Sequence, residues 1–367
     1  MDLTAHTLDL TLTTPFRISR SVQTLAHNVL TRIDTDGVEG IGEAAPSSFY
    51  GERRESVFMA LSDFSEHIAE DPGRIEDIVT AMDRRLHANA AAKASVDMAL
   101  YDLLGKRLGA PVYQLLGLNP ERTPLTSFTI GIDKPDVMAR KAAEAAKQYP
   151  ILKIKVGTVH DLEIVRAIRE ATDVTLRVDA NAAWTPKEAI RVIHELEPYN
   201  IEFVEQPLQP DDIEGLRFVR ERVAMPIIAD ESCVTESDIP RLVGAVDGIN
   251  IKLMKCGGIH HALRMIHTAR AHHLKVMLGC MIESSLAITA AAHLSPLVDY
   301  ADLDGNLLIS DDPWEGVRVE HGKLMLPDRA GLGVRPRDHE ARRRLASAAS
   351  SSRHLRHATP SDEEEEE

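Results

Sequence analysis

Short apolar runs that each end in a polar residue recur at a nearly constant spacing through the later part of the chain. Seven such runs read ILKIKVG, VTLRVDAN, IEFVEQP, PIIADES, GINIKLMK, LKVMLGCMIES and YADLDG. The polar residues near their ends follow one another in steps of 24, 26, 25, 25, 25 and 24 residues: Lys155, Asp179, Glu205, Asp230, Lys255, Cys280 and Asp304. A β-strand, a turn and a helix of three turns need about 25 residues, so this spacing predicts a repeated βα unit.

An earlier run, LTSFTIGI, adds an eighth predicted strand. Eight βα strands in series favour an α/β fold with a (β/α)8-type barrel. A doubly wound open sheet is the alternative, but no GxGxxG motif follows the first strand. In barrels the active site lies at the carboxyl ends of the strands. The polar residues at the ends of the runs are therefore expected to converge on one mouth.

The first 121 residues have a different pattern. DLTLTT and NVLTRIDTD alternate apolar and polar residues, as half-buried antiparallel strands do, and AAAKASVDMALYDLLGKRLG has apolar residues at helical spacing. We therefore predict an α+β unit over residues 1–121. Residues 344–367 are poor in large apolar side chains and end in DEEEEE, which predicts a disordered acidic tail.

Composition argues against several classes of partner. The net charge of −15 argues against nucleic acid. No apolar run approaches the roughly 20 residues that a membrane helix needs. The three cysteines have no CxxC spacing, which argues against a zinc site or a disulfide framework and fits a reducing, cytoplasmic location. A small-molecule substrate is the expected partner, and the sequence is compatible with a homo-oligomer without fixing one.

Three carboxylates end consecutive predicted strands: Asp179, Glu205 and Asp230. Crowded together, they would repel one another, and a hard divalent cation would remove the conflict. Ligands that are all oxygen favour Mg²⁺ over zinc, and three protein ligands leave positions open for substrate. Helix caps or ion pairs with barrel lysines are the alternative interpretation.

Lysines flank this triad in strand order. Lys153 and Lys155 are two residues apart on one strand, so both side chains point to the same face. Lys255 follows the triad, and strands two and six of a closed barrel stand on opposite sides. We therefore predict that Lys155 and Lys255 face each other as catalytic acid–base groups. Lys153 is expected to steady the negative charge that develops on the substrate.

The motifs RVDAN, EQP and ADES, with LKIKVG before them and IKLMKCGG after them, resemble the enolase superfamily and, within it, the muconate lactonizing enzyme subgroup. The resemblance covers about residues 1–335. It implies an α+β capping domain (1–121) on a modified (β/α)7β TIM-like barrel (122–320), with a segment (321–343) that returns to the cap. It also implies removal of a proton α to a carboxylate, giving an enediolate held on Mg²⁺.

Two sequences narrow the resemblance. ADLDG resembles the Asp-x-Asp pair with which dipeptide epimerases hold the substrate's α-ammonium group, here Asp302 and Asp304; a turn cap before Gly305 is the alternative. LGCMIESS lacks the His base of the superfamily's sugar-acid dehydratases and mandelate racemase. Glu283 in it resembles the family's strand-seven glutamate, an expected hydrogen-bonding partner inside the mouth.

The loops TPFRISRSVQTLAH and PSSFYGE occupy positions where the capping domain shapes specificity in this family. Some Ala-Glu epimerases have an arginine where this chain has Gln23. Arg17 or Arg20 could supply the missing charge at the substrate, or could be ordinary surface arginines, and the sequence leaves both interpretations open.

The resemblance therefore implies a Mg²⁺-dependent dipeptide epimerase, with Ala-Glu as the default substrate. N-acylamino acid racemase, o-succinylbenzoate synthase and muconate cycloisomerase are alternatives in the same subgroup, but none has an evident need for Asp302 and Asp304. A Schiff-base aldolase with Lys155 or Lys255 as nucleophile is an alternative of a different class. A non-catalytic binding protein would have no use for two opposed lysines.

Overall fold

The computed structural model describes residues 2–66, 71–341 and 345. The chain begins with an antiparallel sheet in the order β1 (Asp2–Ile18), β2 (Ser21–Thr35) and β3 (Val38–Ala44). Gly40 and Gly42 on β3 lie directly against the backbone of α3 (Ala90–Leu108), where an added methyl group would overlap carbonyl oxygens of the helix. Alternation of buried and exposed residues along β1 gives this sheet one apolar face, and α3 packs against it.

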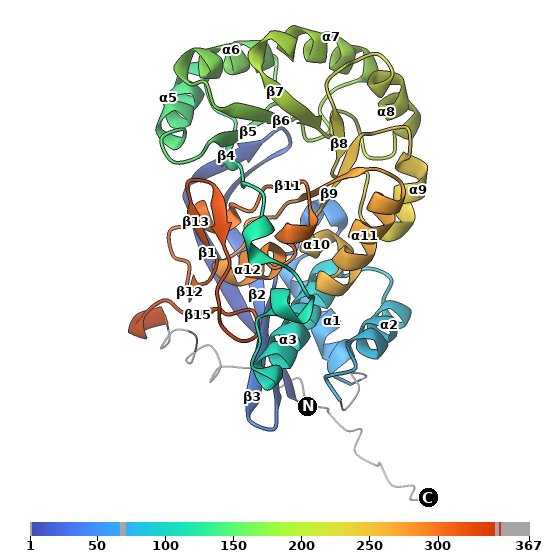
Figure 1. The fold of residues 1–367 in the computed structure, drawn as a ribbon, viewed down its shortest axis with the longest axis vertical. Coiled ribbons are helices and arrows are strands. Elements are labelled where there is room, and N and C mark those ends of the chain that lie inside the picture. Colours follow the sequence, from blue (N-terminus) through green and yellow to red (C-terminus); the bar gives the residue numbers. More distant parts are fainter. Residues whose placement is uncertain (1, 67–70, 342–344, 346–367) are drawn as a thin grey trace, which may run out of the picture.

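Three further helices complete this part of the molecule: α1 (Arg54–Ser65), α2 (Ile75–Arg85) and the short α4 (Val112–Leu115). Both α1 and α2 pack on α3. The two helices lie together with α3 below the barrel in Figure 1.

Eight strands form a parallel sheet in the order of the sequence, as the spacing of the apolar runs predicts. They are β4 (Phe128–Ile130), β5 (Ile151–Lys155), β6 (Thr175–Asp179), β7 (Ile201–Glu205), β8 (Ile227–Ala229), β9 (Gly248–Ile251), β10 (Lys275–Leu278) and β11 (Tyr300–Ala301). The sheet curls until its ends meet, where the Ser127 N–H donates to the Ala301 carbonyl oxygen at 3.1 Å. The predicted barrel is therefore confirmed.

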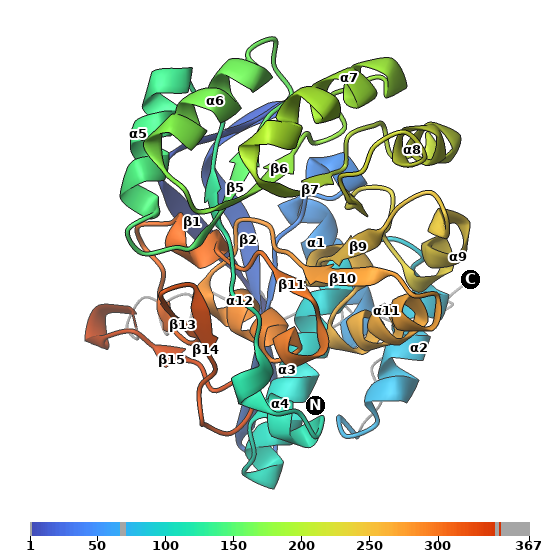
Figure 2. The same cartoon turned by 45° about the horizontal axis from the view of Figure 1, so that its top comes forward.

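Helices connect the strands and cover the outside of the curled sheet (Figure 2). They are α5 (Pro135–Ala145), α6 (Asp161–Ala171), α7 (Pro186–Leu196), α8 (Ile213–Arg220), α9 (Ile239–Leu242), α10 (Leu253–Cys256), α11 (Ile259–Ala271) and α12 (Ser285–Ala292). The amphipathic α6 shows why they pack there: Ile164, Val165 and Ile168 are buried on one side. A single 3-10 turn, Gly305–Leu307, follows β11 where an eighth helix would stand, so the barrel is of the (β/α)7β type.

The chain then returns to α3 through the short strands β12 (Trp314–Glu315), β13 (Arg318–Glu320), β14 (Lys323–Met325) and β15 (Arg335–Pro336). Asp102 of α3 is buried, and its Oδ1 accepts a hydrogen bond from the Leu332 N–H at 2.8 Å. The division of the chain after residues 121, 320 and 343 stays a prediction. Apart from residue 345, the predicted acidic tail lies outside the described residues.

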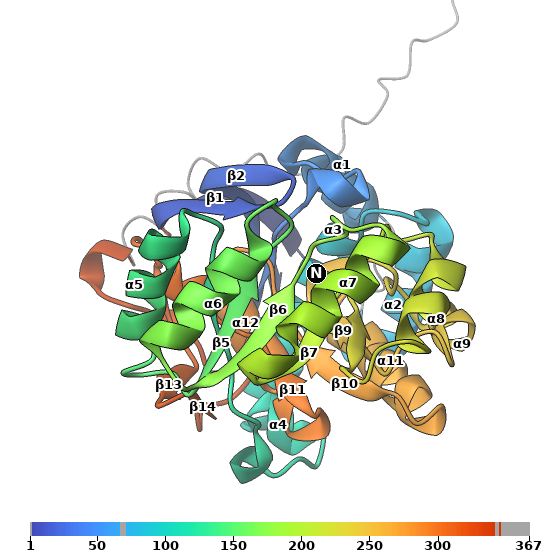
Figure 3. The same ribbon diagram turned by 90° about the horizontal axis from the view of Figure 1, so that it is seen from above.

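The hairpin of β1 and β2 reaches from the first sheet to the barrel. The Ile132 N–H, just after β4, donates to the Arg17 carbonyl oxygen at 2.8 Å. In Figure 1 the tip of the hairpin lies beside β5 and β6, and Figure 3 shows the hairpin beside α5 and α6 from above. The described ranges contain no helix that is long and apolar enough to cross a membrane.

Candidate active site

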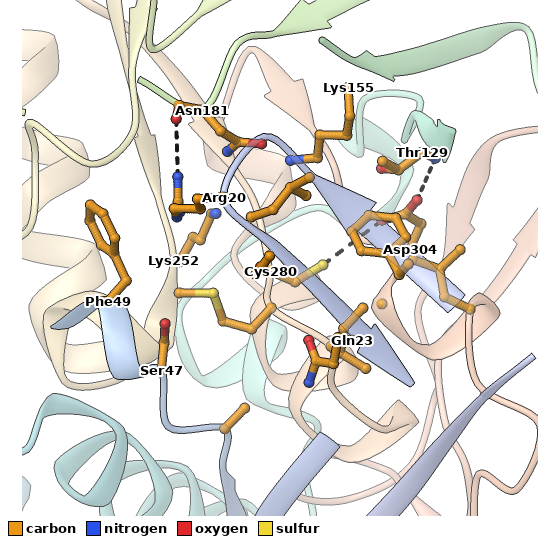
Figure 4. A pocket seen from close by; sticks show the side chains of 18 of the residues that line it. Arg20, Gln23, Ser47, Phe49, Thr129, Lys155, Asn181, Lys252, Cys280 and Asp304 are labelled. Atoms are coloured by element: carbon orange, nitrogen blue, oxygen red, sulfur yellow. Dashed lines mark hydrogen bonds between the residues drawn. The ribbon is translucent and has the colours of Figure 1, made fainter. Parts of the chain in front are cut away.

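A pocket of about 480 Å³ lies between the carboxyl ends of the barrel strands and the β1–β2 hairpin (Figure 4). From the barrel, its lining includes Thr129, Lys153, Lys155, Asn181, Lys252, Cys280, Asp302 and Asp304. From the hairpin and the loop after β3, it includes Phe16, Ile18, Arg20, Val22, Gln23 and Phe49. The barrel supplies nearly all of the charge, and the hairpin side supplies most of the large apolar side chains.

The three predicted carboxylates stand next to one another at the mouth. Asp179 ends β6, Glu205 ends β7, and these two residues are partners in the parallel register. Asp230 follows β8 directly. All three are essentially inaccessible to solvent, with at most 1% of their surface exposed. Buried carboxylates need compensating positive charge, because an unpaired one is costly to desolvate.

Lysine ammonium groups provide that charge. The Lys153 Nζ lies 2.7 Å from Glu205 Oε2, 3.1 Å from Asp179 Oδ2 and 2.7 Å from Asp302 Oδ2. The Lys155 Nζ donates to Asp179 Oδ2 at 2.7 Å and lines the pocket (Figure 4). The two lysines of β5 thus differ in their surroundings. Lys153 lies among three carboxylates, whereas Lys155 contacts only Asp179 and faces the pocket.

The prediction that Lys255 faces Lys155 across the mouth is wrong. Lys255 lies on α10, and its Nζ contacts Asp230 Oδ1 at 2.6 Å and three carbonyl oxygens, of Asp230, Cys233 and Asn250, within 2.9 Å. With 1% of its surface exposed, the side chain points away from the pocket at the mouth. Since β9 ends at Ile251, the residue that follows the strand is Lys252.

Lys252 occupies the position that the sequence analysis gives to Lys255. Its Nζ lies 2.7 Å from Asp230 Oδ2, and its side chain lines the pocket (Figure 4). Strands β5 and β9 are four strands apart in a curled sheet of eight, so Lys155 and Lys252 approach the pocket from opposite sides. Burial disfavours the Lys252 ammonium, but the surrounding carboxylates, with Asp230 foremost among them, together outweigh burial and raise the pKa of Lys252.

The carboxylates differ in their protonation. Burial and the neighbouring Asp179 raise the pKa of Glu205 to about 7. Burial also disfavours the charged forms of Asp179 and Asp230, but nearby lysines reverse that effect and lower both pKa values. Of these three carboxylates, Glu205 is therefore the one whose pKa is raised.

The carboxylate oxygens of Asp179, Glu205 and Asp230 are ligands of the kind that a hard divalent cation prefers. Glu205 Oε2 and Asp230 Oδ2 are buried and accept no hydrogen bond of good geometry, and each lies 2.7 Å from a lysine Nζ. Within the described residues, however, no group of three His, Cys, Asp or Glu side chains is arranged to hold a metal ion. Asp179, Glu205 and Asp230 therefore stay the predicted Mg²⁺ ligands, with ammonium groups now beside each of them.

The two aspartates after β11 have different partners. Asp302 is bound by Lys153 at 2.7 Å and by the Ser127 hydroxyl at 2.6 Å. Asp304 accepts the Thr129 N–H at 2.6 Å and forms no ion pair with any lysine or arginine in the described part of the chain. Burial and the nearby Asp302 raise the pKa of Asp304 to about 7. Asp304 is thus the carboxylate in this pocket that lacks a positive partner.

Glu283 lies outside the pocket lining, contrary to the expectation from the sequence, whereas Arg20, whose role the sequence leaves open, lies in it. Glu283 accepts the Met281 N–H at 2.7 Å and is buried behind the pocket, not in its lining. Arg20, at the hairpin tip, lines the pocket, but its guanidinium lies 2.8 Å from Glu231 Oε1 and donates to the Asn181 carbonyl oxygen at 3.2 Å. The Gln23 amide also lines the pocket.

Sequence models of two families match the chain. The model "Mandelate racemase / muconate lactonizing enzyme, N-terminal domain" matches residues 2–117, and "Enolase C-terminal domain-like" matches residues 137–341. The chain belongs to the enolase superfamily. The strand-end motifs that carry the resemblance supply the lysines and carboxylates that pair at the mouth of the barrel.

Three relatives within the superfamily illustrate its range. An L-Ala-D/L-Glu epimerase from Bacteroides thetaiotaomicron is 44% identical over 335 residues, which cover 91% of this chain and 88% of the relative. The structure of a dipeptide epimerase from Enterococcus faecalis V583 with Mg and L-Leu-L-Tyr has a TM-score of 0.87 at 41% identity, covering 91% of this chain and 98% of the other. An N-succinyl Arg/Lys racemase from Bacillus cereus ATCC 14579 has a TM-score of 0.89 at 30% identity, covering 94% and 98%.

Lys252, which follows β9, and Lys255 on α10 should respond differently to substitution. Lys255→Met removes the buried ammonium that contacts Asp230 Oδ1 and three carbonyl oxygens, so we expect the free energy of unfolding to fall by about 3–5 kcal/mol. Lys252→Met should cost clearly less, because the Lys252 Nζ has an ion pair with Asp230 but none of the three carbonyl contacts of Lys255. Urea denaturation followed by circular dichroism measures both. Equal losses for the two variants would contradict the assignment of Lys255 to the interior.

Proposed function

We propose that this protein is a Mg²⁺-dependent dipeptide epimerase, an isomerase that inverts the α-carbon of the C-terminal residue of a dipeptide. The observation that carries the proposal is the pair of lysines, Lys155 and Lys252, that enter one pocket from opposite sides beside a carboxylate triad. Inversion of a carbon centre needs one group to remove the proton from one face and another to return a proton to the opposite face.

The protein's own groups divide the work. The neutral amine of one lysine accepts the α-proton, while the ammonium of the other delivers a proton to the opposite face, and the reverse reaction exchanges their roles. Lys153 places a fixed positive charge beside Glu205 and Asp179, where negative charge builds up on the substrate carboxylate. Asp179, Glu205 and Asp230 would hold Mg²⁺, which would supply further positive charge for that carboxylate.

Asp304 gives the reason to prefer a dipeptide with a free amino group. A buried carboxylate in the lining without a positive partner favours a substrate ammonium, and Asp302 adds a second negative charge nearby. N-acylamino acid racemase is the second candidate, since it would use the same lysines and metal. An N-acylated substrate has no cation to pair with Asp304. Muconate cycloisomerase, with its dianionic substrate, fits this corner of the pocket less well.

A Schiff-base aldolase needs a lysine free to attack a carbonyl, and Lys155 and Lys252 are both held by carboxylates. A cytoplasmic location and self-association stay predictions from the sequence; all three cysteines are free, as a reducing compartment requires.

Exchange of the α-proton in D₂O tests the two-base mechanism. In Lys252→Ala we expect net epimerisation of a dipeptide to fall at least 100-fold, while deuterium still enters the epimer that Lys155 attacks. Lys155→Ala should show the mirror pattern with the other epimer. Mass spectrometry and chiral chromatography measure exchange and inversion separately. Near-normal inversion by Lys252→Ala would leave a one-base mechanism and remove the epimerase assignment.

The role of Asp304 is tested by comparing free and N-acetylated forms of one dipeptide. In Asp304→Asn we expect kcat/KM for the free dipeptide to fall about 10–100-fold, since a charge-assisted contact is worth roughly 1.5–3 kcal/mol. The N-acetylated form, which carries no ammonium, should change by less than about threefold. An equal loss for both forms would assign Asp304 to structure and favour the racemase candidate.

The metal assignment is tested with Mg²⁺ alone. Glu205→Gln keeps the size of the side chain but removes its charge, so calorimetric titration should show Mg²⁺ affinity reduced at least 10-fold, and turnover should fall with it. Glu195→Gln, on the exposed surface of α7, is the matched control and should bind Mg²⁺ normally. Unchanged affinity in Glu205→Gln would remove this carboxylate from the metal site.

A further inference from the structure

We propose that the dipeptides accepted by this pocket have uncharged, predominantly apolar side chains. The inference rests on the proposed function, because it assumes a dipeptide whose charged ends are held by the barrel. It concerns the opposite side of the pocket, which is built by the β1–β2 hairpin and the loop after β3.

The pocket has two chemically different sides. The barrel side carries Lys153, Lys155, Lys252, Asp302 and Asp304, which match the carboxylate and the ammonium of a dipeptide. A substrate held by these groups has its backbone against the barrel, so its side chains extend toward the hairpin. The hairpin side therefore decides which side chains are accepted.

Four residues, which we call the apolar wall, supply the large apolar side chains of the hairpin side: Phe16, Ile18, Val22 and Phe49. Val22 is 52% exposed and Phe49 is 41% exposed, although both face the pocket. Figure 4 shows Phe49 at the edge of the pocket near Arg20. Apolar surface left open beside a binding pocket is stabilised when an apolar ligand group covers it.

The remaining hairpin residues offer little charge to a substrate. His27 pairs with the exposed Asp9, 2.9 Å away, and Ser21, Gln23 and Ser47 are uncharged. No acidic side chain lines the hairpin side, so a lysine side chain of the substrate finds no partner there.

Arg20 is the residue on the hairpin side that could bind an acidic side chain of the substrate, but it already forms an ion pair within the protein. Its guanidinium is paired with the buried Glu231 at 2.8 Å, donates to the Asn181 carbonyl oxygen, and lies 4.2 Å from the centre of the Phe49 ring. An acidic substrate would have to compete with Glu231, whose side chain is 1% exposed and would be left without its cation. Arg20 is therefore a positioning residue: it ties the hairpin tip to the barrel and supports the ring of Phe49.

A panel of L-Ala-L-X dipeptides, with X as Leu, Phe, Ala, Glu or Lys, tests the inference through α-deuterium exchange. We expect kcat/KM for Leu and Phe to exceed that for Glu and Lys at least 10-fold. A preference for Glu or Lys would overturn the inference and leave the epimerase standing. Exchange with none of the five dipeptides would instead overturn the proposed function, and the inference with it.

Variants then locate the preference. Val22→Ser should lower the ratio of kcat/KM for Leu over Ala about fivefold, whereas Leu25→Ser, on the same strand but outside the pocket lining, should keep the ratio. Arg20→Gln should lower kcat/KM for all substrates by a similar factor, because it loosens the hairpin. A loss confined to the Glu substrate would show that Arg20 reads an acidic side chain, and an unchanged ratio in Val22→Ser would remove the apolar wall from substrate selection.

Discussion

The pairing of buried ammonium groups with buried carboxylates at the carboxyl ends of the barrel strands is the constraint on which the site depends. Parallel strands bring Asp179, Glu205 and Asp230 to one edge, and none of them reaches water. Removing one partner of such a set leaves an uncompensated buried charge, which costs several kcal/mol. Lys153 is central because it contacts Glu205, Asp179 and Asp302 together, and so it joins the middle of the triad to the last strand.

The same pairing links metal binding to the behaviour of the lysines. Each predicted ligand carboxylate has an ammonium group beside it, so a divalent cation held by Asp179 or Asp230 would compete with Lys155 or Lys252 for the same oxygens. A barrel mouth with carboxylates alone would bind the cation, but it would have no proton carriers positioned by the same oxygens.

The sequence predicts the strands well because each is an apolar run that is buried on both faces, and the βα unit has a nearly fixed length. It misplaces the second lysine because a constant step selects Lys255, while β9 already ends at Ile251 and α10 follows. The alternation of side chains along a strand is the sequence signal for Lys252, because residues 250 and 252 lie on the same face. The structure shows that this face points to the carboxylates, since Asn250 donates to Glu205 Oε1 at 2.8 Å. The rule that pairs Lys153 with Lys155 thus applies to GINIK as well.

The hairpin side of the pocket could not be predicted in the same way. Arg20 and Glu231 lie far apart in the sequence and meet only in the fold, and no local pattern in either loop predicts their contact. The ion-pair partner of Arg20 determines its role. An arginine without a partner at this position would attract an acidic substrate, whereas Arg20 paired with Glu231 holds the hairpin in place. Because Glu231 pairs with the charge of Arg20, the apolar side chains of Val22 and Phe49 are the main groups left to contact a substrate side chain. The residues proposed for the reaction therefore lie at strand ends that a sequence pattern reveals, whereas those proposed for substrate choice depend on contacts between distant segments that only the fold brings together.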